Sequence, residues 1–136
     1  MNRSVRRMWS CCVVASALAC GSDDSGDDQV TFTKDIHPIF QMKCGSSECH
    51  ATPNSFLPGH GAADVNAAYT EATKIWGGGQ PVYEIILRKI ASTNPADLMP
   101  PDYAVPPCQG GLGKPGCVTQ AEYDLIKKWV DEGRPK

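Results

Sequence analysis

The sequence predicts an all-α fold in which three to four short helices are joined by long ordered loops. Apolar residues recur at helical spacing in four stretches of the chain, whereas the alternation typical of strands is nearly absent. Thirteen glycines and eleven prolines among 136 residues favour short helices with irregular connections between them.

The first helix is predicted over residues 35–44. Its apolar side chains recur at i, i+3, i+4 and i+8 and so share one face: Ile36, Ile39, Phe40 and Cys44. Thr33 or Asp35 can cap the N-terminus, and Pro38 is tolerated because it lies near the start. This helix leads directly into a cluster of cysteine and histidine residues.

A second helix is predicted over residues 81–92, and a weaker one over 64–75. Pro81 suits the first position of a helix, where its missing N–H costs nothing. The apolar stripe of the stronger helix consists of Val82, Ile85, Ile86 and Ile90. This stripe predicts that one side of the helix is buried.

The last helix has the clearest pattern. Thr119 and Glu122 are spaced as a capping box, and Gly133 followed by Pro135 ends the helix. The expected buried stripe consists of Leu125, Ile126, Trp129 and Val130. Long irregular connections are expected over residues 51–63 and 93–118.

Residues 1–19 are predicted to be an export signal. Arg3, Arg6 and Arg7 form a basic start, and the mostly apolar run that follows is too short to span a bilayer. Small residues precede Cys20, and this arrangement resembles the processing site of bacterial lipoproteins, in which the cysteine takes diacylglycerol. We therefore expect lipidation at Cys20. The alternative is an ordinary signal peptide or membrane anchor with a chance cysteine.

The residues after Cys20 are polar and acidic and lack apolar periodicity. We expect residues 20–29 to form a flexible tether and residues 30–136 to form one small domain. The domain is expected on the periplasmic side of a bacterial membrane, held there by lipid. The formal net charge is −2, and Lys and Arg residues are dispersed, so no nucleic-acid partner is expected. A monomer is expected.

The most informative motif of the chain consists of Cys44, Cys49 and His50. Two thiols followed at once by a histidine are the pattern by which a c-type haem is attached. The two thiols would form thioether links to the haem edge, and His50 would bind the iron as its proximal ligand. Four residues separate the cysteines where the common motif has two, so part of 45–48 is expected to bulge outward.

Met99 is the predicted ligand on the opposite side of the iron. It precedes Pro100 and Pro101, and a residue before proline is restricted to extended conformations. Such a stiff loop can present a side chain in a fixed position, far enough from His50 in sequence to reach the other face. A thioether ligand favours reduced iron, and it leaves no ready site for oxygen or substrate.

Three other side chains are weaker candidates for this position. Met42 lies two residues before Cys44 and is expected to fill the core on the proximal side. His37 is expected at the surface or at the ring edge. His60 lies in a glycine-containing loop that is expected to be flexible and able to swing toward the iron.

This scheme accounts for all seven cysteines. Cys11 and Cys12 leave with the export signal, Cys20 takes lipid, and Cys44 and Cys49 take haem. Cys108 and Cys117 remain, and two thiols in an oxidising compartment are expected to form a disulfide. That bond would restrain the loop that follows Met99.

Four segments occur in the order found in a family of small exported bacterial c-type cytochrome domains, and the chain resembles that family. The segments are residues 30–40, the cluster of Cys44, Cys49 and His50, residues 98–101 and residues 123–133. The resemblance implies a cytochrome c-like helical fold around one covalent haem c. It also implies attachment to Cys44 and Cys49, with His50 and Met99 as the two iron ligands.

The expected function is that of a monohaem cytochrome which carries single electrons between redox partner proteins in the periplasm or membrane. An enzyme is not expected, because no acid–base pair or nucleophile arrangement is apparent. A haem sensor or a peroxidase-like domain with an open distal site is an alternative if Met99 does not bind.

Two further alternatives do not involve haem. The first is a structural zinc-binding lipoprotein that uses Cys44, Cys49, His50 and His60, or the second cysteine pair. The second is a disulfide-stapled adhesion module in which Cys44 pairs with Cys49.

Overall fold

The computed structural model describes residues 29–47, 49–54, 56–101, 107–108 and 110–136. Within these ranges it contains four α-helices, one short π-helix and an isolated bridge between Ile75 and Pro81, but no strand. The predicted all-α class is therefore confirmed. The expected export signal, the lipidation site Cys20 and nearly all of the expected tether lie outside the described residues.

The helices follow one another in the order predicted from the sequence. The π-helix η1 (Phe32–Ile36) runs into α1 (His37–Cys44), and α2 (Val65–Thr73), α3 (Val82–Ile90) and α4 (Gln120–Asp131) follow. The capping box of α4 is present, with the Thr119 side chain accepting from the Glu122 N–H. Each α-helix lies inside the stretch expected for it, and the connections between them are irregular.

The start of the first helical segment differs from the prediction. The helical turns begin at Phe32, and Thr31 is the capping residue in place of Thr33 or Asp35. The Asp35 carboxylate accepts a hydrogen bond from the Thr31 N–H at 2.8 Å. The side chain of Thr31 in turn accepts from the Lys34 N–H. Two side chains thus satisfy backbone donors of the first turn.

Aromatic side chains join the first and last helical segments of the domain. We call this region the aromatic end; it consists of Phe32, Phe40, Tyr69 and Trp129. The rings of Phe32 and Trp129 lie 5.4 Å apart, and both side chains are fully buried. The Trp129 indole N–H and the Phe32 N–H both donate to the Pro135 carbonyl, at 2.8 and 2.9 Å. The first and last helical segments therefore meet at one place.

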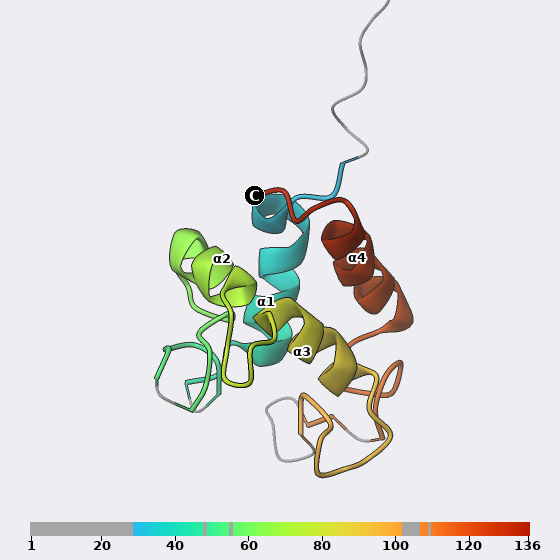
Figure 1. Ribbon diagram of the computed structural model, residues 1–136. Helices are drawn as coiled ribbons and strands as arrows, with labels where there is room; N and C mark the ends of the chain where they lie inside the picture. The colour runs from blue at the N-terminus through green and yellow to red at the C-terminus, as the bar shows by residue number, and fades with distance from the viewer. Residues whose placement is uncertain (1–28, 48, 55, 102–106, 109) are drawn as a thin grey trace, which may run out of the picture.

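The two long connections lie at the other end of the molecule. In Figure 1 the described parts of residues 45–64 and 91–119 lie away from the C-terminus, below α1 and α3. Helix α4 packs on η1 and α3, and α2 packs on α1 and α3. We call the region formed by these two connections the loop end. It is there that Cys44, Cys49, His50 and Met99 come together.

Candidate cofactor site

A cavity of about 560 Å³ opens at the loop end. Its walls include all four residues that the sequence proposes for haem attachment and ligation: Cys44, Cys49, His50 and Met99. Roughly 300–1,000 Å³ is the usual size of cofactor and small-molecule sites. The fold therefore gathers around one space residues that are far apart in the sequence.

One wall of the cavity is the apolar face of α3. The predicted stripe of this helix contributes Val82, Ile85, Ile86 and Ile90, and Trp76 and Leu57 extend the apolar lining. The stripe is buried as predicted, apart from the half-buried Ile85. The same side chains serve both the core and the cavity, so the wall suits a large apolar group.

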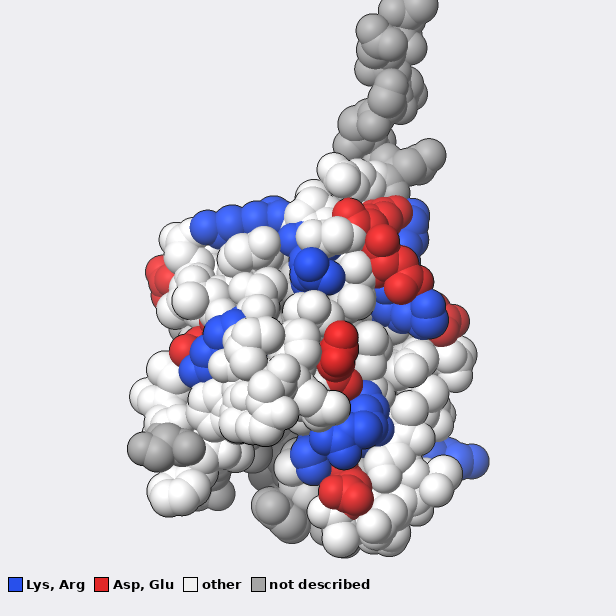
Figure 2. Space-filling view, viewed as in Figure 1, with Lys and Arg blue, Asp and Glu red and all other residues white. Residues whose placement is uncertain are grey.

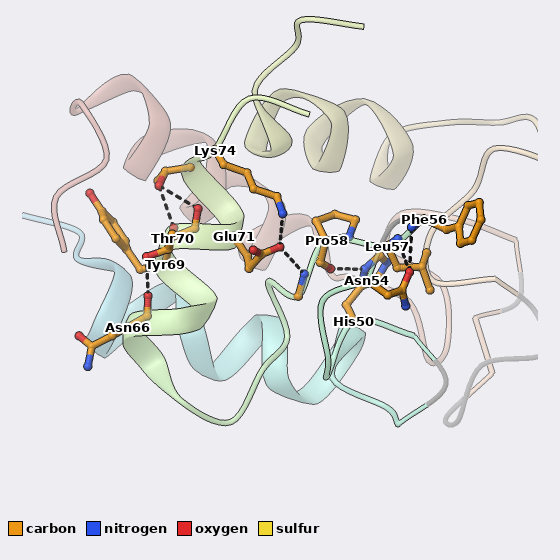
Figure 3. A network of polar contacts seen from close by, with 12 residues as sticks. His50, Asn54, Phe56, Leu57, Pro58, Asn66, Tyr69, Thr70, Glu71 and Lys74 are labelled. Atoms are coloured by element: carbon orange, nitrogen blue, oxygen red, sulfur yellow. Dashed lines mark hydrogen bonds and ion pairs between the residues drawn. The ribbon is translucent and has the colours of Figure 1, made fainter. Parts of the chain in front are cut away.

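His50 is fixed by a hydrogen bond to the backbone. Its Nδ1 lies 2.7 Å from the carbonyl oxygen of Pro58 (Figure 3), and a carbonyl can only accept. Nδ1 therefore carries the proton and donates, which leaves Nε2 of the neutral ring with a free lone pair. Burial lowers the pKa of His50, although the Pro58 carbonyl opposes that shift. The neutral ring is the form that binds a metal ion.

The position of His50 is fixed by close packing between two backbone segments, the one after α1 and residues 58–62. A Cβ atom at Gly45 would come within 2.8 Å of the Gly61 carbonyl oxygen, and one at Gly61 within 2.8 Å of the Gly45 backbone. The Gly61 N–H donates to the His50 carbonyl, and the His50 N–H donates to the Cys44 carbonyl, both at 3.0 Å. Glycine is therefore needed at both positions for the segment after α1 to pack against residues 58–62.

Cys44 and Cys49 are half-buried free thiols on the cavity wall. Burial raises the pKa of the Cys44 thiol to about 12; nearby Cys49 adds to the shift and Lys43 opposes it. The Cys49 N–H donates to the Ser46 carbonyl at 3.0 Å, which closes a turn between the two cysteines. The expected bulge within 45–48 includes residue 48, which lies outside the described residues.

Met99 is held from both sides. Its N–H donates to the Lys89 carbonyl at the end of α3, and the Pro101 carbonyl accepts from the Cys108 N–H at 3.4 Å. The structure joins Cys108 to Cys117 in a disulfide, and Leu98 packs against that pair. The short segment that carries Met99 is thus anchored to a helix on one side and to the disulfide loop on the other.

The structure places His60 differently from the prediction of a flexible loop. The side chain is only 3% exposed, and its ring lies 4.1 Å from that of His50 and 5.2 Å from that of Phe40. Burial, with a smaller contribution from His50, lowers the pKa of His60 well below its ordinary value. Its Nδ1 is the one buried side-chain nitrogen or oxygen without a hydrogen-bond partner in the described part of the chain.

The expected positions of His37 and Met42 are both wrong. His37 is buried, with Nε2 2.8 Å from the Ala62 carbonyl oxygen and its ring against Phe32, and it does not line the cavity. Met42 is 67% exposed, so it does not fill the core, and it lies at the margin of the cavity. The hydrogen bond of His37 therefore stabilises the fold outside the cavity, whereas Met42 lies at the margin of the site.

Lysine side chains in the cavity wall were not anticipated. Lys43 and Lys89 both line the cavity, and Lys89 pairs with Asp97 at 3.4 Å. From the sequence, Lys and Arg residues are expected only to be dispersed over the chain. A signal for Lys89 was nevertheless present, because it follows Ile85 by four residues and Ile86 by three, which places it along the apolar stripe.

Two further observations concern metal binding and membrane insertion. In the described ranges, no three His, Cys, Asp or Glu side chains are grouped so that they could hold a metal ion. No helix in the same ranges is long and apolar enough to cross a membrane.

Comparisons with protein-family models, curated proteins and solved structures gave no significant match.

Proposed function

We propose that this chain is an exported, lipid-anchored monohaem c-type cytochrome with a cytochrome c-like fold. The observation that carries the proposal is the cavity of about 560 Å³ with Cys44, Cys49, His50 and Met99 in its walls. Two thiols next to a histidine, and a thioether from a distant loop, form the donor set that a c-type haem requires.

The residues present fit such a group. His50 carries its proton on Nδ1, which is bonded to the Pro58 carbonyl, so Nε2 is the nitrogen available to iron. The α3 stripe provides an apolar wall for the face of a macrocycle. His60, whose Nδ1 lacks a partner among the described residues, lines the cavity, and its ring lies next to that of His50. Cys44 and Cys49 would form the thioether links.

The protein would set the properties of the bound group through its ligands and its walls. When bound, haem supplies a one-electron couple between ferric and ferrous iron. Met99 would favour the reduced state because thioether sulfur is a weaker donor to ferric iron than a second imidazole is. If His50 and Met99 both bound the iron, the site would favour electron transfer over reaction with oxygen or peroxide.

The proposed partners are redox proteins of the periplasm or membrane. Phe56 and Met42 are both largely exposed and both border the cavity, so a partner could make apolar contact beside the haem edge. Acidic and basic side chains are interspersed over the face shown in Figure 2. The lipid on Cys20 would confine the domain to a membrane surface and raise its rate of encounter with partners in that membrane.

Optical spectra of the protein, produced together with cytochrome c maturation machinery, test the proposed ligand set. We expect the ferric protein to show the charge-transfer band of methionine sulfur on iron. Met99→Ala should abolish this band and allow carbon monoxide to bind the ferrous form. Met42→Ala is the matched control, because Met42 also borders the cavity, and it should leave the band unchanged. A band that survives in Met99→Ala would contradict the assignment.

A further inference from the structure

A carboxylate on α2 is connected to His50 through a single peptide group. The Oε2 atom of Glu71 accepts a hydrogen bond from the Gly59 N–H at 2.9 Å. That N–H belongs to the same planar peptide unit as the Pro58 carbonyl, which accepts from His50 Nδ1 at 2.7 Å. Figure 3 shows Glu71 and His50 on opposite sides of this peptide.

The two hydrogen bonds of this peptide reinforce each other. Acceptance by a charged carboxylate polarises the amide, and the carbonyl at its other end becomes a stronger acceptor. Each bond in such a chain is strengthened by about 10–30%. A stronger acceptor at Pro58 withdraws the Nδ1 proton further from His50, and the ring becomes a stronger electron donor at Nε2.

Glu71 is well placed to act in this way. Its side chain is only 15% exposed, so solvent screens it little, and it pairs with Lys74. Lys74 in turn lies over the ring of Trp76 at 4.4 Å, and Trp76 lines the cavity. The Lys74 ammonium draws electron density from the carboxylate and so moderates its effect on the peptide.

We propose that Glu71 is a positioning residue which sets the electron-donating strength of His50 through the Pro58–Gly59 peptide and thereby lowers the potential of the bound haem. The inference rests on the proposed function. Glu71 does not line the cavity, so it would act on the haem through the Pro58–Gly59 peptide and not by contact. Lys74 opposes its influence, so the two residues should change the potential in opposite directions.

The test compares three substitutions in haem-loaded protein. Glu71→Gln keeps an oxygen that can accept from Gly59 but removes the charge, whereas Lys74→Met leaves Glu71 in place and removes its counter-ion. Asp97→Asn is the matched control, because it also removes a carboxylate paired with a lysine near the cavity but has no peptide link to His50. The readouts are the midpoint potential and the nuclear magnetic resonance of the His50 Nδ1 proton in the ferrous state.

We expect Glu71→Gln to raise the ferrous-to-ferric ratio at a fixed potential at least threefold, where tenfold corresponds to about 59 mV. The His50 Nδ1 proton should then resonate at lower frequency, because its hydrogen bond is weaker. Lys74→Met should produce the opposite change in both readouts. Asp97→Asn should leave the proton resonance unchanged.

An unchanged Nδ1 resonance in both Glu71→Gln and Lys74→Met would overturn the relay alone, whatever the potential does. A potential that moves equally in Glu71→Gln and Asp97→Asn, without a change in the resonance, would show a through-space charge effect and would also overturn the relay. A wild-type protein that takes up no covalent haem would overturn the proposed function, and the tuning role with it.

Discussion

The aromatic end and the loop end of the domain are built in different ways. At the aromatic end, the rings of Phe40, Tyr69 and Trp129 each pack on Phe32, and the Trp129 N–H has a backbone partner. At the loop end, apolar side chains surround a cavity, and the buried Nδ1 of His60 has no partner within the described residues. Protein interiors are normally close-packed, so this contrast supports the proposal that the loop end takes up a bound group, whereas the aromatic end packs on itself.

Trp129→Ala should have the largest effect on stability. The fully buried indole contacts Phe32 and Tyr83, and its removal leaves a cavity at the centre of the aromatic end. We expect a loss of about 3–5 kcal/mol in the free energy of unfolding, measured by denaturant titration of haem-free protein. A loss below about 1 kcal/mol would mean that this end is not the main source of stability.

Removal of the disulfide should have the next largest effect. Cys108 and Cys117 close a loop with a sequence separation of 9, and the double substitution to Ser should cost about 2–3 kcal/mol of unfolding free energy. The Met99 segment should also exchange its amide protons faster, because the Cys108 N–H bonds to Pro101. Wild-type protein in reducing buffer is the control and should behave like the variant.

Thr119→Ala should have a smaller effect. It removes the side chain that accepts from the Glu122 N–H at the start of α4, and caps of this kind are worth about 1 kcal/mol. The change can be measured by thermal or denaturant unfolding. Thr119 lies where the loop end joins α4 and does not line the cavity, so the cavity should still take up haem normally. A loss of haem uptake in Thr119→Ala would mean that this cap also positions the cavity wall.

Met99→Ala should have the smallest effect on haem-free protein. The side chain is half-buried and borders a cavity, so the unfolding free energy should fall by less than about 1 kcal/mol. The same substitution should destabilise haem-loaded protein more strongly, because it removes a ligand that binds only the folded state. Equal effects with and without haem would contradict the ligand assignment.

Local patterns were enough to predict the helices. The apolar stripe of α3, the capping box of Thr119 and Glu122 and the terminating Gly133 are all features of sequence-neighbouring residues. They depend little on the rest of the fold. His50 and Met99 also line the same cavity, but their role as ligands on the two sides of a haem stays a prediction.

The remaining features depend on contacts between distant residues. His37 is buried, and the Ala62 carbonyl, twenty-five residues away, accepts its hydrogen bond. Hydrophobic periodicity in the sequence does not predict a pair so far apart. Met42 lies exposed although the sequence suggests a core position. The bond between Glu71 and Gly59 joins a helix to an irregular loop, and backbone donors in loops leave no pattern in the sequence.

The most direct test of the central claim is the mass of the protein made with cytochrome c maturation machinery. We predict an increase equal to one haem that survives denaturation, with Cys44 and Cys49 protected from alkylation. Cys44→Ser/Cys49→Ser should show no such increase. A wild-type protein that carries no haem after denaturation, and in which both thiols react with an alkylating reagent, would contradict the claim that the loop end is a covalent haem site.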